Sequence, residues 1–271
     1  MKKGLSVILL ALVLMGCADR TTNVTASSSL VDFLYPKRGD YVEHEPEMPT
    51  LTLPVNMGIA FVPASYSSGS MHLSAKEKHD ILKRVKDEFI QLNYVHRIEI
   101  ISDNYLTPGG SFETLDQLSR LYNIDLIALV SYDQVSRSNE NNASLLYWTI
   151  AGMYLIPGNS NTTQTFIDTA LFDIDSRKML FRAPGISKVG SLSTAVGVDE
   201  SLHEDTTEGF DLAVNDMVTN LNTELDTFKI RVKEEKIAHV ETREGFSLGG
   251  GSVGGGALLG MLWLAFIRRK R

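Results

Sequence analysis

The residues best placed for chemistry stand at the two ends of the chain. The single cysteine, Cys17, follows a short basic start, Lys2 and Lys3, and an apolar run from Leu5 to Met15. One cysteine cannot form an intramolecular disulfide, and it excludes a cysteine-based metal site. The apolar run is too short to span a bilayer comfortably and is typical of a secretory signal. We therefore expect the chemistry of Cys17 to depend on its place at the end of this signal.

Residues Leu14, Met15, Gly16 and Cys17 resemble the bacterial lipobox, although Met15 departs from the small residue usual at its position. The resemblance implies cleavage between Gly16 and Cys17, acylation of Cys17 and attachment to membrane lipid through its acyl chains. Ala18 stands where an inner-membrane retention signal would place aspartate, which implies sorting to the outer membrane of a Gram-negative envelope. The alternative is a plain signal peptide with an incidental cysteine.

The other end combines glycines, a short apolar run and a basic cluster. Val253 to Ile267 is a run of 15 residues, which spans about 22 Å as a helix against a hydrocarbon core of about 30 Å. The cations of Arg268 to Arg271 predict a cytoplasmic C-terminus and a body outside the inner membrane. Each glycine weakens a helix by roughly 1 kcal/mol relative to alanine, so this segment unwinds more easily than a helix without glycine. The glycines in question are Gly249, Gly250, Gly251, Gly254, Gly255 and Gly256.

Charge limits what the rest of the chain can bind. The 271 residues carry a formal net charge of -7. Without Lys2, Lys3 and the four cations of Arg268 to Arg271, 20 basic side chains face 33 acidic ones, a charge of -13. Binding to nucleic acid depends on neutralising phosphates with Lys and Arg, so we expect no nucleic-acid partner. Anionic lipid is disfavoured as a ligand of the body for the same reason.

The central part of the chain predicts an α/β domain with a βαβαβ core. Apolar runs at 57–63, 97–102 and 126–132 have the length of strands, and the third is nearly all apolar. Ser74 and Glu77 form a capping box that begins a helix, and a second helix follows from about Ser111. Crossovers of this length favour parallel strands in one sheet.

Antiparallel signals and one long helix follow this core. Segments beginning near Ser144, near Thr163 and at Lys178 predict further strands, with a hairpin turn at 173–178. We expect a loop from Pro184 to Leu202 and then a long helix. Its apolar stripe repeats at spacings of three and four, which favours a core face over a coiled-coil seam. The stripe comprises Phe210, Val214, Met217, Leu221, Leu225, Phe228 and Val232.

Other patterns that could carry catalysis or metal binding are weak. The six histidines include no H-E-x-x-H motif, and no G-x-S-x-G elbow is present, so we predict no catalytic residue, metal or cofactor. Glu204, Asp205 and Glu208 are expected to favour the positive end of a helix dipole. Ligands of α/β folds bind at the carboxyl ends of parallel strands, so Asp133 with the loop at 109–110 is the best available ligand site.

This order of elements resembles the rhombotarget lipoprotein family over essentially the whole mature chain. The resemblance rests on the lipobox, the segments "NIDLIALVSYDQ" and "LFDIDSRKMLFRAPG", and the glycine-rich tail. It implies that the tail is a GlyGly-CTERM signal recognised by rhombosortase, a rhomboid-type serine protease. The alternative for the tail is a permanent second anchor with a glycine hinge. A weaker likeness, of fold alone, is to envelope lipoproteins such as the curli secretion lipoprotein.

The predicted organisation is a signal peptide at 1–16, a tether at 17–50, a globular α/β domain at 51–236, a linker at 237–248 and a transmembrane tail at 249–271. Three functions remain open. The first is a non-enzymatic interaction module in the cell envelope with an unknown protein partner. The second is a structural tether that keeps both membrane anchors. The third is an enzyme with an unrecognised site.

Overall fold

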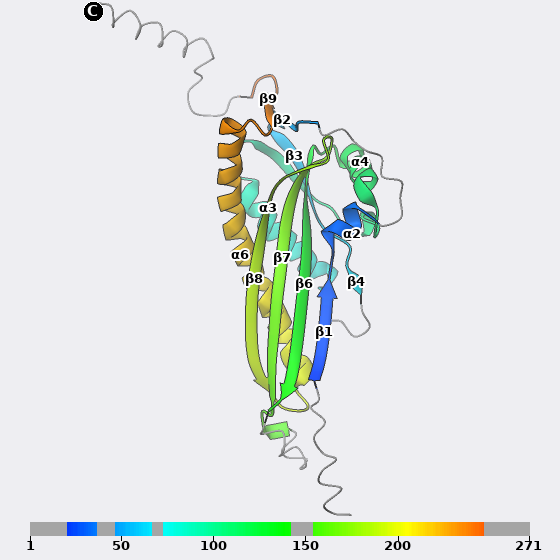
Figure 1. Cartoon of the computed structure of the whole chain (residues 1–271), viewed down its shortest axis with the longest axis vertical. Coiled ribbons are helices and arrows are strands. Elements are labelled where there is room, and N and C mark those ends of the chain that lie inside the picture. The colour runs from blue at the N-terminus through cyan, green and yellow to red at the C-terminus, as the bar shows by residue number, and fades with distance from the viewer. Residues whose placement is uncertain (1–20, 37–46, 67–72, 142–153, 247–271) are drawn as a thin grey trace, which may run out of the picture.

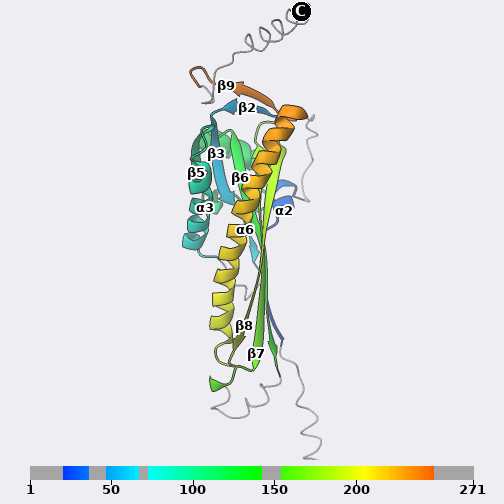
Figure 2. The ribbon, with the colours of Figure 1, turned by 90° about the vertical axis from the view of Figure 1, so that its left-hand side faces the viewer.

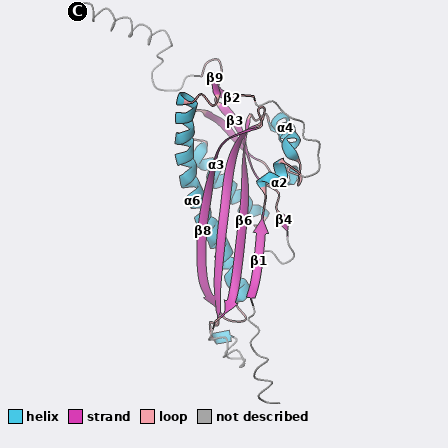
Figure 3. Cartoon of the chain, viewed as in Figure 1, coloured by secondary structure: helices cyan, strands magenta, loops and turns pink. Residues whose placement is uncertain are grey.

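A computed structural model describes residues 21–36, 47–66, 73–141 and 154–246. These form a mixed α/β fold built on one seven-stranded sheet, with a separate two-stranded sheet at one end (Figures 1 and 3). Among these residues no helix combines the length and apolar character needed to cross a bilayer. The strands are β1 (Thr21–Ser27), β2 (Thr50–Leu53), β3 (Val55–Phe61), β4 (Ser65–Tyr66), β5 (Val95–Ile100), β6 (Leu126–Glu140), β7 (Asn159–Asp173), β8 (Lys178–Ser193) and β9 (His239–Thr242). The helices are α2 (Leu30–Leu34), α3 (Ala75–Phe89), the 3-10 turn η1 (Asp103–Tyr105), α4 (Ser111–Tyr122) and α6 (Val198–Glu234).

The predicted parallel core is present. Strand β3 pairs in parallel with β5 on one side and with the first part of β6 on the other. Ser74 caps α3, and its hydroxyl and the Glu77 carboxylate make both hydrogen bonds of the capping box. The buried apolar residues form two separate clusters, one on each face of the sheet. Those of α3 belong to one cluster and those of α4 to the other, so the two helices pack on opposite faces.

Strand β6 is twice as long as predicted and carries the antiparallel part of the sheet. It pairs with β7 along its whole length, and β7 pairs with β8. We call the part of β6, β7 and β8 that continues beyond β3 the distal sheet; it comprises residues 133–140, 159–166 and 186–193. The strand predicted near Ser144 falls mostly outside the described residues.

Residues 21–27, expected to belong to a tether with little structure, form β1. This strand pairs with β6 from Ser27 opposite Asp133 to Thr21 opposite Asn139, and so occupies the edge that β3 leaves free. Its sequence, TTNVTAS, is polar but rich in β-branched residues, which favour extended backbone. The pairing partner lies more than a hundred residues away, and composition alone gave no sign of it.

The loop predicted from Pro184 to Leu202 is wrong for most of its length, because most of these residues form strand or helix. Strand β8 continues through Pro184 to Ser193, and α6 begins at Val198. Proline is tolerated here because β8 is an edge strand, where the missing N–H would face away from β7. The hairpin turn before β8 is confirmed, with the Ser176 N–H bound to the Asp173 carboxylate at 3.0 Å.

Helix α6 has 37 residues, which makes it about 55 Å long. Figure 2 shows it running along the whole sheet, from the distal end to the end that carries β2 and β9. The predicted apolar stripe is confirmed over most of its length, because Phe210, Val214, Met217, Leu221 and Phe228 are buried on the sheet.

The chain enters and leaves the fold at opposite ends of α6. Thr21 lies opposite Asn139, at the distal end, where four residues separate the end of β8 from the start of α6. Strand β9 follows the other end of the helix and pairs in parallel with β2, so part of the predicted linker at 237–248 is an ordered strand. We call these ends the entry pole and the exit pole.

Candidate functional site

The predicted processing residues lie outside the described residues. These are Gly16, Cys17, Gly249, Gly250, Gly251, Gly254, Gly255 and Gly256. What the structure adds is their distance along the chain from ordered elements. Strand β1 begins at Thr21, four residues after Cys17, and the last described residue, Phe246, precedes Gly249 by three. Both predicted processing segments are therefore only a few residues along the chain from the described body.

A hollow of about 160 Å³ lies at the carboxyl ends of β3 and β5. Its polar groups come from the start of α3 and from the turn after β5, and they are Lys78, His79, Ser102 and Asp103. The Lys78 ammonium binds the Asp103 carboxylate at 2.6 Å, and the Lys78 side chain is only 10 % exposed. A cation and a carboxylate in a hollow at this edge of an α/β sheet occupy the usual position of a ligand site.

The sequence contains one sign of this pair, in the position of Lys78. Lys78 precedes Leu82, Val85 and Phe89 at spacings of four, three and four, so it falls on the buried stripe of α3. A lysine on such a stripe needs a partner when it is buried. Asp103, however, lies in a turn 25 residues away, and only the parallel packing of β5 beside β3 brings it to Lys78.

The ligand site predicted at Asp133 and residues 109–110 is not assembled. Asp133 is exposed in the middle of β6, opposite Ser27 of β1, because β6 continues past the parallel core. Gly109 lies beside Pro36 instead, with a positive φ of 71° that suits glycine. The carboxyl end of β6 is therefore far along the distal sheet, and the edge of the parallel core is formed by β3 and β5 alone.

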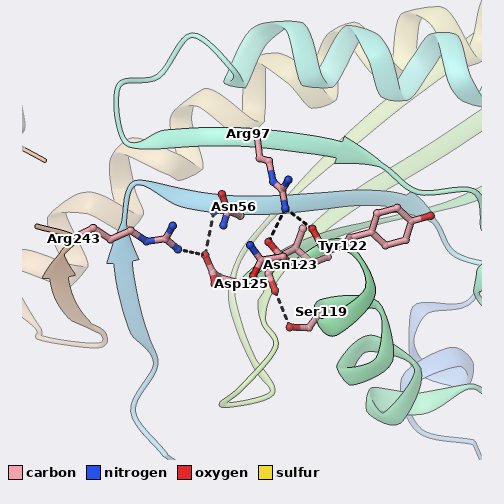
Figure 4. A network of polar contacts seen from close by, with 8 residues as sticks. Asn56, Arg97, Ser119, Tyr122, Asn123, Asp125 and Arg243 are labelled. Carbon is pink, nitrogen blue, oxygen red and sulfur yellow. Dashed lines mark hydrogen bonds and ion pairs between the residues drawn. The ribbon is translucent and has the colours of Figure 1, made fainter. Parts of the chain in front are cut away.

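A polar network joins the amino ends of the parallel strands to the segment after β9 (Figure 4). The Asp125 carboxylate accepts hydrogen bonds from the Asn56 backbone N–H and from the Arg243 guanidinium, both at 3.1 Å. On the other side, Arg97 donates to the carbonyl oxygens of Tyr122 and Asn123, at the end of α4. Asp125 thus fastens the exit pole to the sheet and is structural in these contacts.

Helix α6 meets the distal sheet through hydrogen bonds as well as apolar contacts. The buried Asn161 amide donates to Ser191, Ser193 and Ser201 at 3.0 to 3.2 Å. The Ser191 hydroxyl in turn donates to the Asp205 carboxylate at 2.6 Å. Glu204, Asp205 and Glu208, expected at the positive end of a helix, lie inside α6 and not at its start. Asp205 instead fastens that helix to β8. These groups satisfy one another, which makes the seam a structural feature.

A second hollow is apolar and lies between the sheet, α3 and α6. It is a cavity of about 100 Å³ whose walls are almost entirely hydrocarbon, from β2 at one end to Leu221 and Phe228 of α6. An empty cavity of this size lowers the free energy of unfolding by about 2 kcal/mol. A wider hollow of about 650 Å³ adjoins it at the exit pole and shares Leu180, Phe181 and Phe228 with it.

Metal binding has no support within the residues that the structure describes. No three carboxylate or histidine side chains gather there at metal-ligand distances. His79, His96, His203 and His239 lie on separate elements, whereas His44 and His72 are outside the described ranges.

Comparison with known proteins returns remote structural likeness only. No family model matches the chain, and no curated protein matches it significantly. A putative neuraminyllactose-binding hemagglutinin homologue from Helicobacter pylori is 8 % identical, with a TM-score of 0.36 over 74 % of this chain and 97 % of that one. A PelC dodecamer variant from Paraburkholderia phytofirmans is 8 % identical, with a TM-score of 0.25 over 60 % and 90 %. A hypothetical protein, CT253, from Chlamydia trachomatis is 13 % identical, with a TM-score of 0.26 over 66 % and 95 %. Scores this low carry no argument about the function of the present chain.

Proposed function

We propose that the chain is a cell-envelope lipoprotein, acylated at Cys17 and trimmed within its glycine-rich tail by a rhomboid-type protease. Its body serves as a non-enzymatic interaction module at the outer membrane or cell surface. The motif at Leu14 to Cys17 and the order of glycines, apolar run and cations in the tail support this proposal. The observation that carries it furthest is the placement of both processing segments within a few residues of an ordered pole.

The position of the two poles suggests how the module works. The lipid attachment precedes β1 by four residues, so the entry pole stays near the bilayer. The exit pole lies at the far end of α6, about 55 Å away. Trimming of the tail would free that pole to meet a protein partner away from the membrane.

The same geometry favours one alternative, a structural tether that keeps both anchors. A chain attached at opposite poles of an elongated body can link two membranes across the length of that body. Two attachments at the same pole would not add that length to the distance between the membranes. Retention of the tail distinguishes this tether from the trimmed lipoprotein. The enzyme alternative would use the hollow at Lys78 and Asp103, where a cation and a carboxylate are already paired.

Intact mass of the mature protein purified from its own host tests the proposal at both ends. The expected mass lacks residues 1–16, carries acyl chains on Cys17 and lacks the segment from about Ala257 to Arg271. The matched variant Cys17→Ala should abolish acyl labelling and leave precursor or soluble protein. Normal acyl labelling of that variant would refute lipidation at Cys17.

Replacement of the six glycines by leucine tests the tail separately. Leucine stiffens and lengthens the apolar helix, so trimming should slow or stop and the protein should remain at the inner membrane. Stoichiometric recovery of peptides containing "MLWLAFIR" from the wild-type mature protein would show that the tail is kept. The tether would then replace the trimmed lipoprotein.

A further inference from the structure

The apolar cavity and the wider hollow beside it differ in character. The cavity is walled by hydrocarbon from the sheet, α3 and α6, and is about two thirds the volume of an engineered apolar cavity of about 150 Å³ that binds benzene. It can therefore accept the end of an alkyl chain, because no polar atom of its lining residues is exposed to the cavity to hold water there. The wider hollow, of about 650 Å³, lies at the exit pole between the start of β8 and the last turns of α6.

Two aromatic rings stand between the two spaces. Phe181 of β8 and Phe228 of α6 line both, and their ring centroids are 5.4 Å apart at an angle of 42°. Phe228 is buried and Phe181 is half-buried, so the pair forms an apolar boundary, and a ligand that joins the two spaces has to displace the Phe181 ring.

The net charge of -7 led us to expect that the body disfavours anionic lipid, but cations gather locally at the wider hollow. Lys178, Arg182 and Arg231 face one carboxylate, Glu224. Arg182 is bound by Asp168 and Arg231 lies 3.4 Å from Glu235, whereas Lys178 makes no ion pair with any residue that the structure describes. An anionic head group in this hollow would therefore have a free ammonium to bind.

We infer that this pair of spaces binds a single-chain anionic amphiphile of the fatty-acid type. The carboxylate lies in the wider hollow beside Lys178, the chain passes Phe181 and Phe228, and its terminal carbons fill the cavity. The inference concerns the body of the protein and does not require lipidation at Cys17 or trimming of the tail.

The test uses cells that express the full chain and are fed a fatty acid carrying a diazirine and an alkyne. Light should cross-link the probe to peptides from Lys178 to Arg182 and from Glu224 to Arg231, and excess oleate should suppress the adducts. Label that appears without light at Cys17 reports acylation instead, so the two proposals succeed or fail separately. The variant Cys17→Ala should retain the light-dependent adducts. Their absence from the wild-type body, or their location elsewhere, would overturn the inference.

Matched variants assign the chain and the head group. Ala128→Leu places three more carbons in the cavity, so light-dependent labelling should fall at least fivefold while the melting temperature is kept or raised. If the melting temperature falls, a second cavity substitution, Leu225→Phe on α6, is tested by the same labelling experiment.

Lys178→Gln tests the head group. It should reduce labelling by the acid but not by its methyl ester. Lys188→Gln, on the same strand but outside the hollow, is the control. Unchanged labelling in the cavity variants, or equal labelling by acid and ester in the wild type, would contradict the assignment.

Discussion

Asp168 of β7 is a buried carboxylate. Its oxygens bind the Arg182 guanidinium of β8 at 2.9 and 3.3 Å, and its side chain is only 10 % exposed. Burial raises the pKa of Asp168 above its usual value, and the nearby Arg182 offsets that shift only in part. The free energy lost by removing the charged carboxylate from water is therefore larger than the free energy gained from its ion pair with Arg182.

This shift predicts a pH-dependent effect of Asp168→Asn. Between about pH 4, where an unfolded aspartate titrates, and the raised pKa, the native state binds more protons, so its stability falls as pH rises. Asparagine removes that loss. The free energy of unfolding of the variant relative to wild type should be greater near pH 7 than near pH 4 in urea titrations. Asp226→Asn, at an exposed position on α6, is the control. A relative stability that falls toward pH 7 would show that the ion pair dominates.

At the scale of elements, α6 and β8 pack closely enough to require glycine. A Cβ atom on Gly185 would lie 2.1 Å from the Ala213 carbonyl oxygen and 2.6 Å from the backbone N of Met217. Because both obstacles are helix backbone, Gly185→Ala should lower the free energy of unfolding by about 3 kcal/mol or more. Chemical denaturation measures this loss. Gly190→Ala on the same strand would meet only the Asn161 carbonyl at 3.6 Å and should cost less than about 1 kcal/mol. Equal losses in the two variants would contradict the close packing.

The same helix covers the edge of β8. The Asp216 carboxylate accepts from the Ile186 N–H at 2.9 Å, and the Asn220 amide donates to the Pro184 carbonyl at 2.8 Å. Edge strands with free backbone groups pair with other chains, so these side chains protect the fold from association.

Removal of both side chains should expose this edge. We expect the double variant Asp216→Ala with Asn220→Ala to lose about 2 kcal/mol of stability and to self-associate, as measured by light scattering after size exclusion. Asn222→Ala, whose amide bonds only to its own helix, should remain like wild type. A double variant with the mass of the wild-type protein would show that the edge is blocked in another way.

At the scale of the whole molecule, the proposed pair of anchors restricts how the body can sit on a membrane while the tail is kept. Four residues join Cys17 to Thr21, and seven join Phe246 to Val253, spans of at most about 14 Å and 25 Å. The poles are separated by the length of α6, about 55 Å. If both anchors enter one bilayer, the long axis can rise no more than about 30° from its plane.

Trimming should therefore allow the exit pole to leave the bilayer. A fluorophore on Glu235→Cys should be strongly quenched by a membrane acceptor when the tail is kept by the six leucine substitutions, and less quenched after trimming. Glu200→Cys, in the first turn of α6 near the entry pole, should be quenched equally in both forms. If Cys17 is acylated as proposed, each new cysteine is the only free thiol of the chain. Equal quenching at Glu235 in both forms would refute this orientation.

The sequence by itself determined the parallel core and the course of α6. The apolar runs, the capping box at Ser74 and Glu77, and the stripe from Phe210 to Phe228 are local signals. They can be recognised from residues that are close together in the sequence. Local signals also identified the hairpin turn before β8. The processing motifs at the two termini are likewise readable from sequence and stay predictions.

Only the tertiary structure decided the rest, because the remaining elements depend on distant partners. The distal sheet buries Asn161, Thr163 and similar polar residues that satisfy one another through α6, so its strands lack the apolar alternation by which strands are recognised. Strand β1 is ordered by the edge that β6 offers it more than a hundred residues later. Lys78 binds Asp103 through contacts between elements that no local pattern encodes. The same is true of the apolar cavity and the wider hollow, which adjoin through residues of β8 and α6.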